Sequence, residues 1–149
     1  LNTDMNTQPI VFLDFDGVIR TPGWNGLAIE NLNKLTEATK ARIVVSSDWR
    51  HSHTDKELKK VLEDHGVRGL NCMETTPILP GDLDSLEWWQ PRCSEIDEYV
   101  RADGVTRFVV LDDMEPLAWS PLAQWLVLCN ANEGFTDKRL EEALKILAL

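Results

Sequence analysis

Short apolar runs alternate with amphipathic stretches along the chain, and this alternation restricts the fold more than any other feature of the sequence. The runs have strand length, are rich in Val, Ile and Leu, and fall at residues 10–13, 42–45, 67–70, 107–111 and 125–128. The stretches between them include residues 27–40 and 55–65, which have the spacing of apolar residues that helices require. Strands that alternate with helices form a parallel sheet in a layered structure. The sequence therefore predicts an α/β fold.

Local signals place several helix ends. Thr54 and Glu57 have the spacing of a capping box, and Gly66 suits the end of the same helix. Pro91 suits a first helical position, and Thr136 can cap a last helix that runs to Leu147. Residues 71–90 lack a clear periodicity and are longer than a usual connection, so we interpret them as a loop.

Size and charge limit the class of protein. A chain of 149 residues can bury the core of one domain, which we expect over residues 1–149, with residues 1–8 as a flexible segment. Its formal charge of −10 disfavours a nucleic-acid partner without excluding it. We see no hydrophobic segment that could anchor the chain, so we expect no membrane partner. Three cysteines without a paired spacing, and the lack of a secretion signal, lead us to expect a cytoplasmic location.

Acidic residues stand where two of the apolar runs end. Asp14 and Asp16 follow residues 10–13, and Asp112 and Asp113 follow residues 107–111. If these runs are neighbouring parallel strands, all four side chains meet at one edge of the sheet. Carboxylates that lie so close repel one another, and oxygen ligands favour Mg²⁺ over zinc or copper. The acids therefore predict a magnesium site.

The same acids belong to a larger pattern. The segment from Asp14 to Val18, Ser46 after a second apolar run, Arg92, and the pair Asp112-Asp113 resemble the haloacid-dehalogenase superfamily, whose motifs come in this order. The stretch Ser-Ser-Asp-Trp-Arg and a late Gly-Phe-Thr look like its small capless members, some of which occur with RNA-repair proteins. The resemblance implies a three-layer Rossmann-like fold, a mostly parallel five-stranded sheet and no cap domain. Any cover for the site then comes from residues 71–90, a partner subunit or the substrate.

The resemblance also implies roles for individual residues. Asp14 is the nucleophile that forms an aspartyl-phosphate, and Asp16 is the general acid and then base. The metal site consists of Asp14, Asp16, Asp112 and Asp113. Asp16 is expected to bind the metal through its backbone carbonyl. The phosphate-binding residues are Ser46, Ser47 and Arg92.

Some of these assignments have competitors. Ser46, Ser47 or Asp48 can instead start a loop or cap the next helix, and the assignment to Ser46 can shift by one position. Arg101 and Arg107 compete with Arg92. His51 and His53 lack further metal-binding partners, so we assign no metal to them. Trp24, Trp88 and Trp89 either stack on an aromatic leaving group or anchor loops to the core.

The expected function is that of a hydrolase, a magnesium-dependent phosphatase that acts on phosphomonoesters. Its partner is a phosphorylated substrate, either a small molecule or an exposed phosphoester on a macromolecule. Two other hypotheses remain open at this point: a phosphorylatable switch similar to a receiver domain, and a non-catalytic binding module on the same fold.

Overall fold

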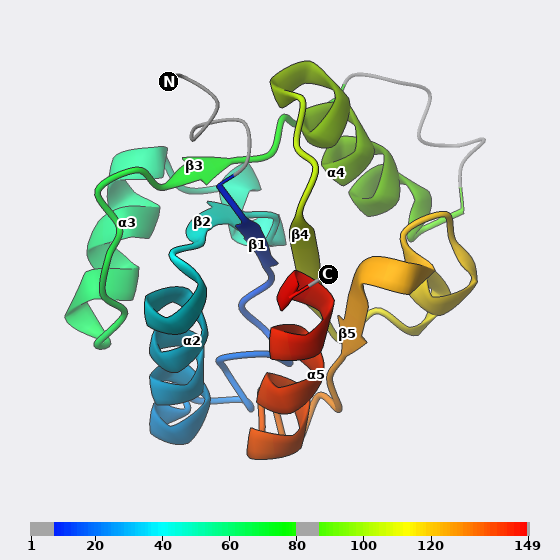
Figure 1. Ribbon diagram of the computed structural model, residues 1–149. Coiled ribbons are helices and arrows are strands. Elements are labelled where there is room, and N and C mark those ends of the chain that lie inside the picture. Colours follow the sequence, from blue (N-terminus) through cyan, green and yellow to red (C-terminus); the bar gives the residue numbers. More distant parts are fainter. Residues whose placement is uncertain (1–7, 80–86, 149) are drawn as a thin grey trace, which may run out of the picture.

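The apolar run Ile10–Leu13 forms the central strand, β1, of a parallel sheet in the computed structural model, which describes residues 8–79 and 87–148 (Figure 1). The five strands lie in the order β3-β2-β1-β4-β5, and all of them are parallel. In chain order the elements are β1, α2 (Gly26–Thr39), β2 (Arg42–Val45), η1 (Asp48–His51), α3 (Asp55–Asp64), β3 (Glu74–Thr75), α4 (Gln90–Asp103), β4 (Phe108–Asp112), η3 (Glu115–Trp119), η4 (Ala123–Trp125), β5 (Leu126–Leu128) and α5 (Asp137–Ala148).

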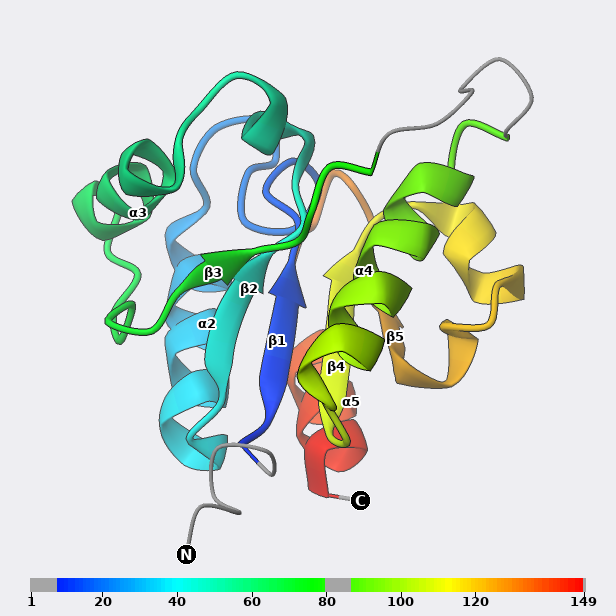
Figure 2. The same cartoon turned by 90° about the horizontal axis from the view of Figure 1, so that it is seen from above.

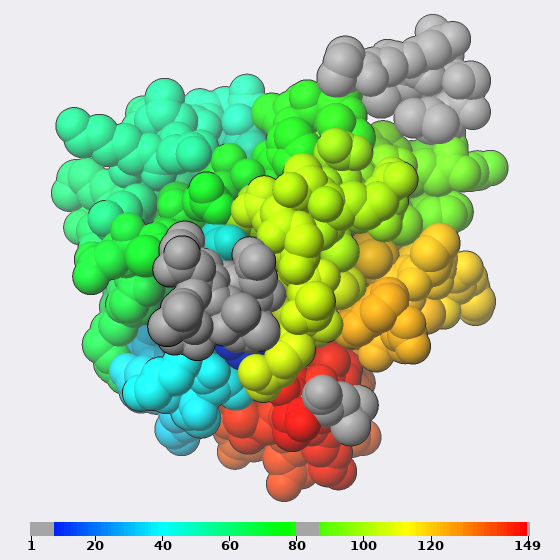
Figure 3. All heavy atoms as spheres, turned by 45° about the horizontal axis from the view of Figure 1, so that its top comes forward, coloured from blue at the N-terminus to red at the C-terminus, as the bar shows by residue number. Residues whose placement is uncertain are grey.

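Two core clusters hold helices against the two faces of the sheet. Because successive strand residues point to opposite faces, Val11 and Leu13 pack with side chains of α2, α3 and α5, whereas Ile10 and Phe12 pack with α4 and η3. Figure 2 shows α2 and α4 on opposite sides of the strands. In Figure 3, α4 lies beside η3 and η4 on the surface. Each fully buried aliphatic or aromatic side chain contributes about 1.5–3 kcal/mol to this packing.

The register of the central strands determines which residues meet at the carboxyl edge. Leu13 of β1 lies beside Val45 of β2 and Leu111 of β4. The residues that follow leave the sheet together, since Asp14 N–H donates to the carbonyl of Leu111 and Ser46 N–H donates to that of Leu13. Acidic and hydroxyl side chains far apart in the sequence are thus brought to one edge of the sheet.

The α/β class and the parallel sheet predicted from the sequence are confirmed, as are most elements. The capping box at Thr54 is present: its hydroxyl accepts from the N–H of Glu57, and the Glu57 side chain accepts from the N–H of Thr54. Pro91 occupies the first turn of α4. The fifth strand begins at Leu126, one residue later than expected, because residues 123–125 form the 3-10 turn η4.

The predicted strand at residues 67–70 is wrong, and the edge strand is β3, inside the segment expected to be a loop. Gly66 and Gly69 have positive φ angles of 98° and 73°, which break an extended run. The backbone N–H groups there bond away from the sheet: that of Val67 donates to the carbonyl of Leu62, and that of Arg68 donates to Asn33. Val67 is buried in the core without being in a strand.

Two expectations concern parts of the chain outside the described residues. The segment expected to be flexible, residues 1–8, falls outside the described residues except for residue 8. Residues 80–86, in the middle of the expected loop at 71–90, also fall outside them. Within residues 8–79 and 87–148, no helix combines the length and apolar character needed to cross a membrane.

Candidate active site

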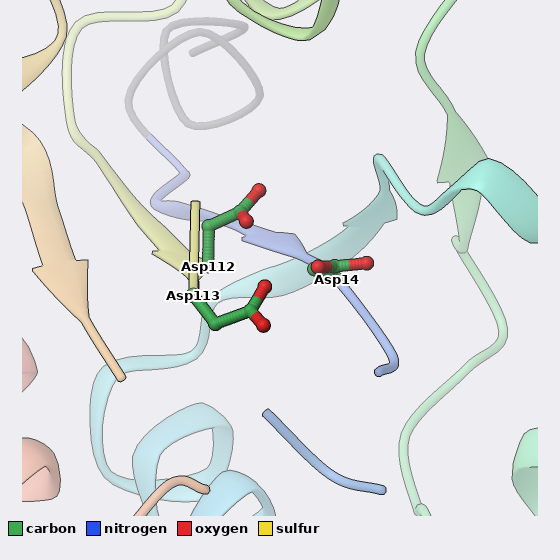
Figure 4. Close-up of side chains that lie close together, drawn as sticks. All are labelled: Asp14, Asp112 and Asp113. Carbon is green, nitrogen blue, oxygen red and sulfur yellow. The ribbon is translucent and has the colours of Figure 1, made fainter. Parts of the chain in front are cut away.

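Three carboxylates meet at the carboxyl edge of the sheet, and we call Asp14, Asp112 and Asp113 the acid group. Asp14 follows β1, Asp112 ends β4 and Asp113 comes next, so the neighbouring strands hold them together (Figure 4). One oxygen of each lies within 4.8 Å of the others. Backbone groups orient two of the side chains, because Phe15 N–H donates to Asp14 Oδ1 at 2.8 Å and Met114 N–H donates to Asp112 Oδ1 at 3.0 Å.

The acid group carries unfavourable electrostatic energy. Burial raises the pKa of Asp14 well above its ordinary value, and the Asp112 carboxylate raises it further, whereas Arg92 lowers it. Burial and the same Asp112 carboxylate also raise the pKa of Asp113. Negative charge here is therefore costly unless a positive charge lies close to it.

Arg92 supplies part of that positive charge. It lies in the first turns of α4, is only 5% exposed, and its Nη1 lies 2.6 Å from Asp112 Oδ2 and 3.5 Å from Asp14 Oδ2. Its Nη2 donates to Asp48 at 2.9 Å. Burial acts to lower the pKa of Arg92, but the three carboxylates together raise it, so the guanidinium stays charged.

The competing arginines lie elsewhere. Arg101 pairs with Asp97 on the exposed side of α4, and Arg107 donates to the carbonyl of Leu147 at the opposite end of β4. The geometry therefore favours Arg92 over these two as the basic residue of the site.

Asp16 does not join the acid group through its side chain. Its carboxylate is exposed, pairs with Arg20, and accepts a hydrogen bond from Trp49 Nε1 at 3.0 Å. Four carboxylates were expected to converge, and within the described residues the group contains three. A metal contact through the backbone carbonyl of Asp16 remains a prediction.

The two serines after β2 differ in what their hydroxyls bond. Ser46 is fully buried, and its Oγ has no hydrogen-bond partner among the described residues. Ser47 is also buried, but its hydroxyl accepts from the N–H of Trp49 and caps η1. A buried hydroxyl without a partner costs about 1–3 kcal/mol, so Ser46 is the serine of the two with an unmet bonding capacity.

The turn after β2 is held in place by a second buried arginine. Arg50 donates to the carbonyl of Ser47 at 2.7 Å and to the hydroxyl and carbonyl of Thr76, and it pairs with Glu95 of α4 at 2.8 Å. The turn is thereby fixed both to the residue that follows the edge strand β3 and to the helix that carries Arg92. Sequence reasoning missed these contacts, because they join residues 26 and 45 positions apart; the only signal was that Arg50 ends the Ser-Ser-Asp-Trp-Arg stretch.

Gly17 makes room for the acid group. Its φ is +85°, and a Cβ at this position would lie 2.2 Å from Asp113 Oδ2. Any other residue would therefore displace a carboxylate of the site.

A mostly apolar hollow of about 530 Å³ adjoins the acid group through Arg92, which also lines it. Trp88 (68% exposed) and Ile78 (50% exposed) lie on its rim. His51 lines it and faces Asp48 at 3.9 Å, whereas His53 stacks on Trp49. Trp89 instead packs against the core on the α4 side of the sheet.

The donor set fits a hard divalent cation. The acid group offers only carboxylate oxygens, the ligand type that Mg²⁺ prefers. Arg92 is shared by Asp14, Asp112 and Asp48, and Asp113 adds a further carboxylate, so the group has an excess of negative charge when its acids are ionised. The charge balance and the ligand type both suit a bound divalent metal ion.

Comparison with known families agrees with this geometry. A model of the family described as the HAD domain in Swiss Army Knife RNA repair proteins, where HAD stands for haloacid dehalogenase, matches residues 10–140. No curated protein and no solved structure shows a significant match. The matched range contains the acid group, Ser46 and Arg92, and the family as a whole is one of phosphoryl-transfer domains. The chain therefore belongs to the haloacid-dehalogenase-like domains of this family.

Proposed function

We propose that the protein is a magnesium-dependent phosphatase that hydrolyses phosphomonoesters through an aspartyl-phosphate on Asp14. The observation that carries this proposal is the acid group beside a buried Arg92, with Ser46 directly after the adjacent strand β2 and its hydroxyl without a partner among the described residues. A carboxylate nucleophile, a charge-neutralising guanidinium and a free hydrogen-bond donor are the parts that phosphoryl transfer needs.

The reaction divides into two steps. An oxygen of Asp14 attacks phosphorus while the bond to the leaving-group oxygen breaks, and Asp16 gives that oxygen a proton. Water then attacks the phosphorus of the aspartyl-phosphate, Asp16 takes a proton from it, and phosphate and the free carboxylate of Asp14 result. Ser46 donates to a phosphoryl oxygen, with Ser47 as its neighbour, and Arg92 offsets the charge that accumulates on the others. Bound at Asp14, Asp112, Asp113 and the carbonyl of Asp16, Mg²⁺ would supply charge neutralisation at the phosphoryl group.

We propose a wider class of substrates than the RNA ends that the family description suggests. That description names RNA repair, which suggests phosphorylated RNA ends, whereas a formal charge of −10 weakens binding to a polynucleotide. A phosphorylated small molecule or an exposed phosphoester on a macromolecule fits both considerations. The apolar hollow beside Arg92 favours a substrate with an apolar or aromatic group near its phosphate.

A phosphate-release assay tests the proposal. It should cover aryl phosphates, sugar phosphates, nucleotides, phosphopeptides and phosphorylated RNA ends, each with and without Mg²⁺. We expect release that requires Mg²⁺ and falls to background in Asp14→Asn. Asp64→Asn is the matched control, because Asp64 is an exposed acid of α3 whose pair with Lys60 is worth little.

Two outcomes would contradict the proposal. One is release by Asp14→Asn at the wild-type rate, which would remove Asp14 as nucleophile. The other is a stable phosphorylated protein that never releases phosphate, which would make the domain a switch.

A further inference from the structure

The carboxylate of Asp16 is held by two side chains, those of Trp49 and Arg20, that have no role in the reaction above. Trp49, in the 3-10 turn η1, donates its indole N–H to Asp16 Oδ2 at 3.0 Å. Arg20 pairs with Oδ1. Because each oxygen has its own partner, both the position and the plane of the carboxylate are defined.

The ring of Trp49 is itself fixed by its neighbours. It lies with its centroid 5.4 Å from that of Phe15, which is fully buried and directly follows Asp14. The imidazole of His53 stacks on the same indole at 5.1 Å. The backbone N–H of Trp49 donates to the hydroxyl of Ser47. The indole N–H is therefore a donor of fixed direction, held in place relative to the segment after β1 that carries the nucleophile.

Arg20 is held on the same aromatic surface. Its guanidinium lies 5.1 Å from the ring centroid of Trp49 and 5.4 Å from that of Trp24. Such cation–π contacts contribute to the orientation of an arginine that is only partly exposed. Trp24 is stacked on His65 at 4.2 Å. The loop after β1 and the turn after β2 thus converge on one carboxylate.

We propose that Trp49 is a positioning residue for Asp16, which fixes one oxygen of this carboxylate while Arg20 fixes the other, so that the carboxyl group is oriented for proton transfer to the leaving group. The inference rests on the proposed function, because it acts through the proton transfer assigned to Asp16. A general acid acts only within hydrogen-bond reach of the atom that it protonates, and a displacement of about 1 Å can remove most of its effect.

A positioning role has a signature that a merely structural role lacks. Phenolate and alkoxide are poor leaving groups that need a proton as they depart, whereas 4-nitrophenolate leaves readily as an anion. Disturbing Asp16 should therefore slow the attack on phenyl phosphate far more than the attack on 4-nitrophenyl phosphate. The value of kcat/KM reports this first step, even if hydrolysis of the aspartyl-phosphate limits kcat.

The test is Trp49→Phe, which keeps an aromatic ring against Phe15 but removes the N–H donor. We expect kcat/KM for phenyl phosphate to fall by about tenfold or more, which is part of the roughly 10²–10⁴ that general acid catalysis supplies. For 4-nitrophenyl phosphate we expect a loss below about threefold. The matched control is Trp119→Phe, because Trp119 is 74% exposed and should change neither value.

A second variant and a double mutant complete the test. Arg20→Gln removes the partner of the other oxygen and should show the same selective loss, which keeps the test decisive if Trp49→Phe fails to fold. In an Asp16→Asn background, Trp49→Phe should have little further effect, because its partner is already lost. Equal losses on both substrates, or full additivity with Asp16→Asn, would overturn the inference. Asp14→Asn separates the two proposals: if it remains active, the proposed function itself fails.

Discussion

Gly17 offers a sharp test of the geometry of the acid group. Alanine at this position adds a Cβ that would lie 2.2 Å from Asp113 Oδ2, so the carboxylate must move by about 1 Å to restore an ordinary contact. A misplacement of about 1 Å in a catalytic group costs about 100-fold in rate. The positive φ of +85° adds a backbone cost of about 1–2 kcal/mol in the free energy of unfolding.

Gly69→Ala separates these two effects. Gly69 has a similar φ of +73°, but a Cβ at this position would meet nothing within 4 Å, so its substitution carries the backbone cost alone. Urea denaturation should give similar losses of stability for the two variants, of about 1–2 kcal/mol. A phosphatase assay at saturating Mg²⁺ should show a loss of about 100-fold for Gly17→Ala only. Full activity in Gly17→Ala, or an equal loss in Gly69→Ala, would refute the reasoning.

The charges and the hollow at the site lead to three more predictions. Arg92→Ala leaves the fully buried Asp112 without its partner. Urea denaturation without magnesium should show that it lowers the free energy of unfolding by about 3–5 kcal/mol, and a loss below about 1 kcal/mol would contradict the pairing. Because the pKa of Asp14 is raised in the folded protein, protonated Asp14 contributes to stability fully below pH 3.8, and this contribution is lost as the pH rises through the folded-state pKa. Without Mg²⁺, the Tm of Asp14→Asn minus the Tm of the wild type should therefore increase from pH 3.8 upward. A difference that does not change with pH would argue against a raised pKa. Trp88→Ala should raise KM for an aryl phosphate by about tenfold and leave KM for glycerol phosphate unchanged, whereas equal changes would place the leaving group outside the hollow.

The parts of the fold that depend on local chemistry were predictable from the sequence. The capping box at Thr54 and Glu57 and the apolar run Ile10–Leu13 each act over a few residues, and both appear in the structure as expected. The strand expected at residues 67–70 failed because Gly66 and Gly69 adopt positive φ angles, and apolar composition alone does not reveal this. β3 is only two residues long and exposes Glu74, so it has no hydrophobic pattern to detect.

The acid group was predictable because strand ends determine it, and the resemblance pointed to Arg92 beside it. Asp14, Asp112 and Asp113 come together because β1 and β4 are neighbours, which the resemblance and the alternation of elements both indicated. The bond between Trp49 and Asp16 spans 33 positions of the chain and depends on how two loops pack. The Ser-Ser-Asp-Trp-Arg stretch marks Trp49 and Arg50, but neither it nor any periodicity identifies their partners Asp16 and Thr76.

The most direct test of the central claim is to locate the covalent phosphate. The protein should be mixed with a phosphomonoester and Mg²⁺, quenched in acid, and reduced with borohydride, which converts an aspartyl-phosphate to homoserine. Peptide mass spectrometry then identifies the modified residue. The account predicts homoserine at position 14 in the magnesium-containing sample alone, with none in Asp14→Asn. Turnover without any modification at Asp14, or modification at another acid, would contradict it.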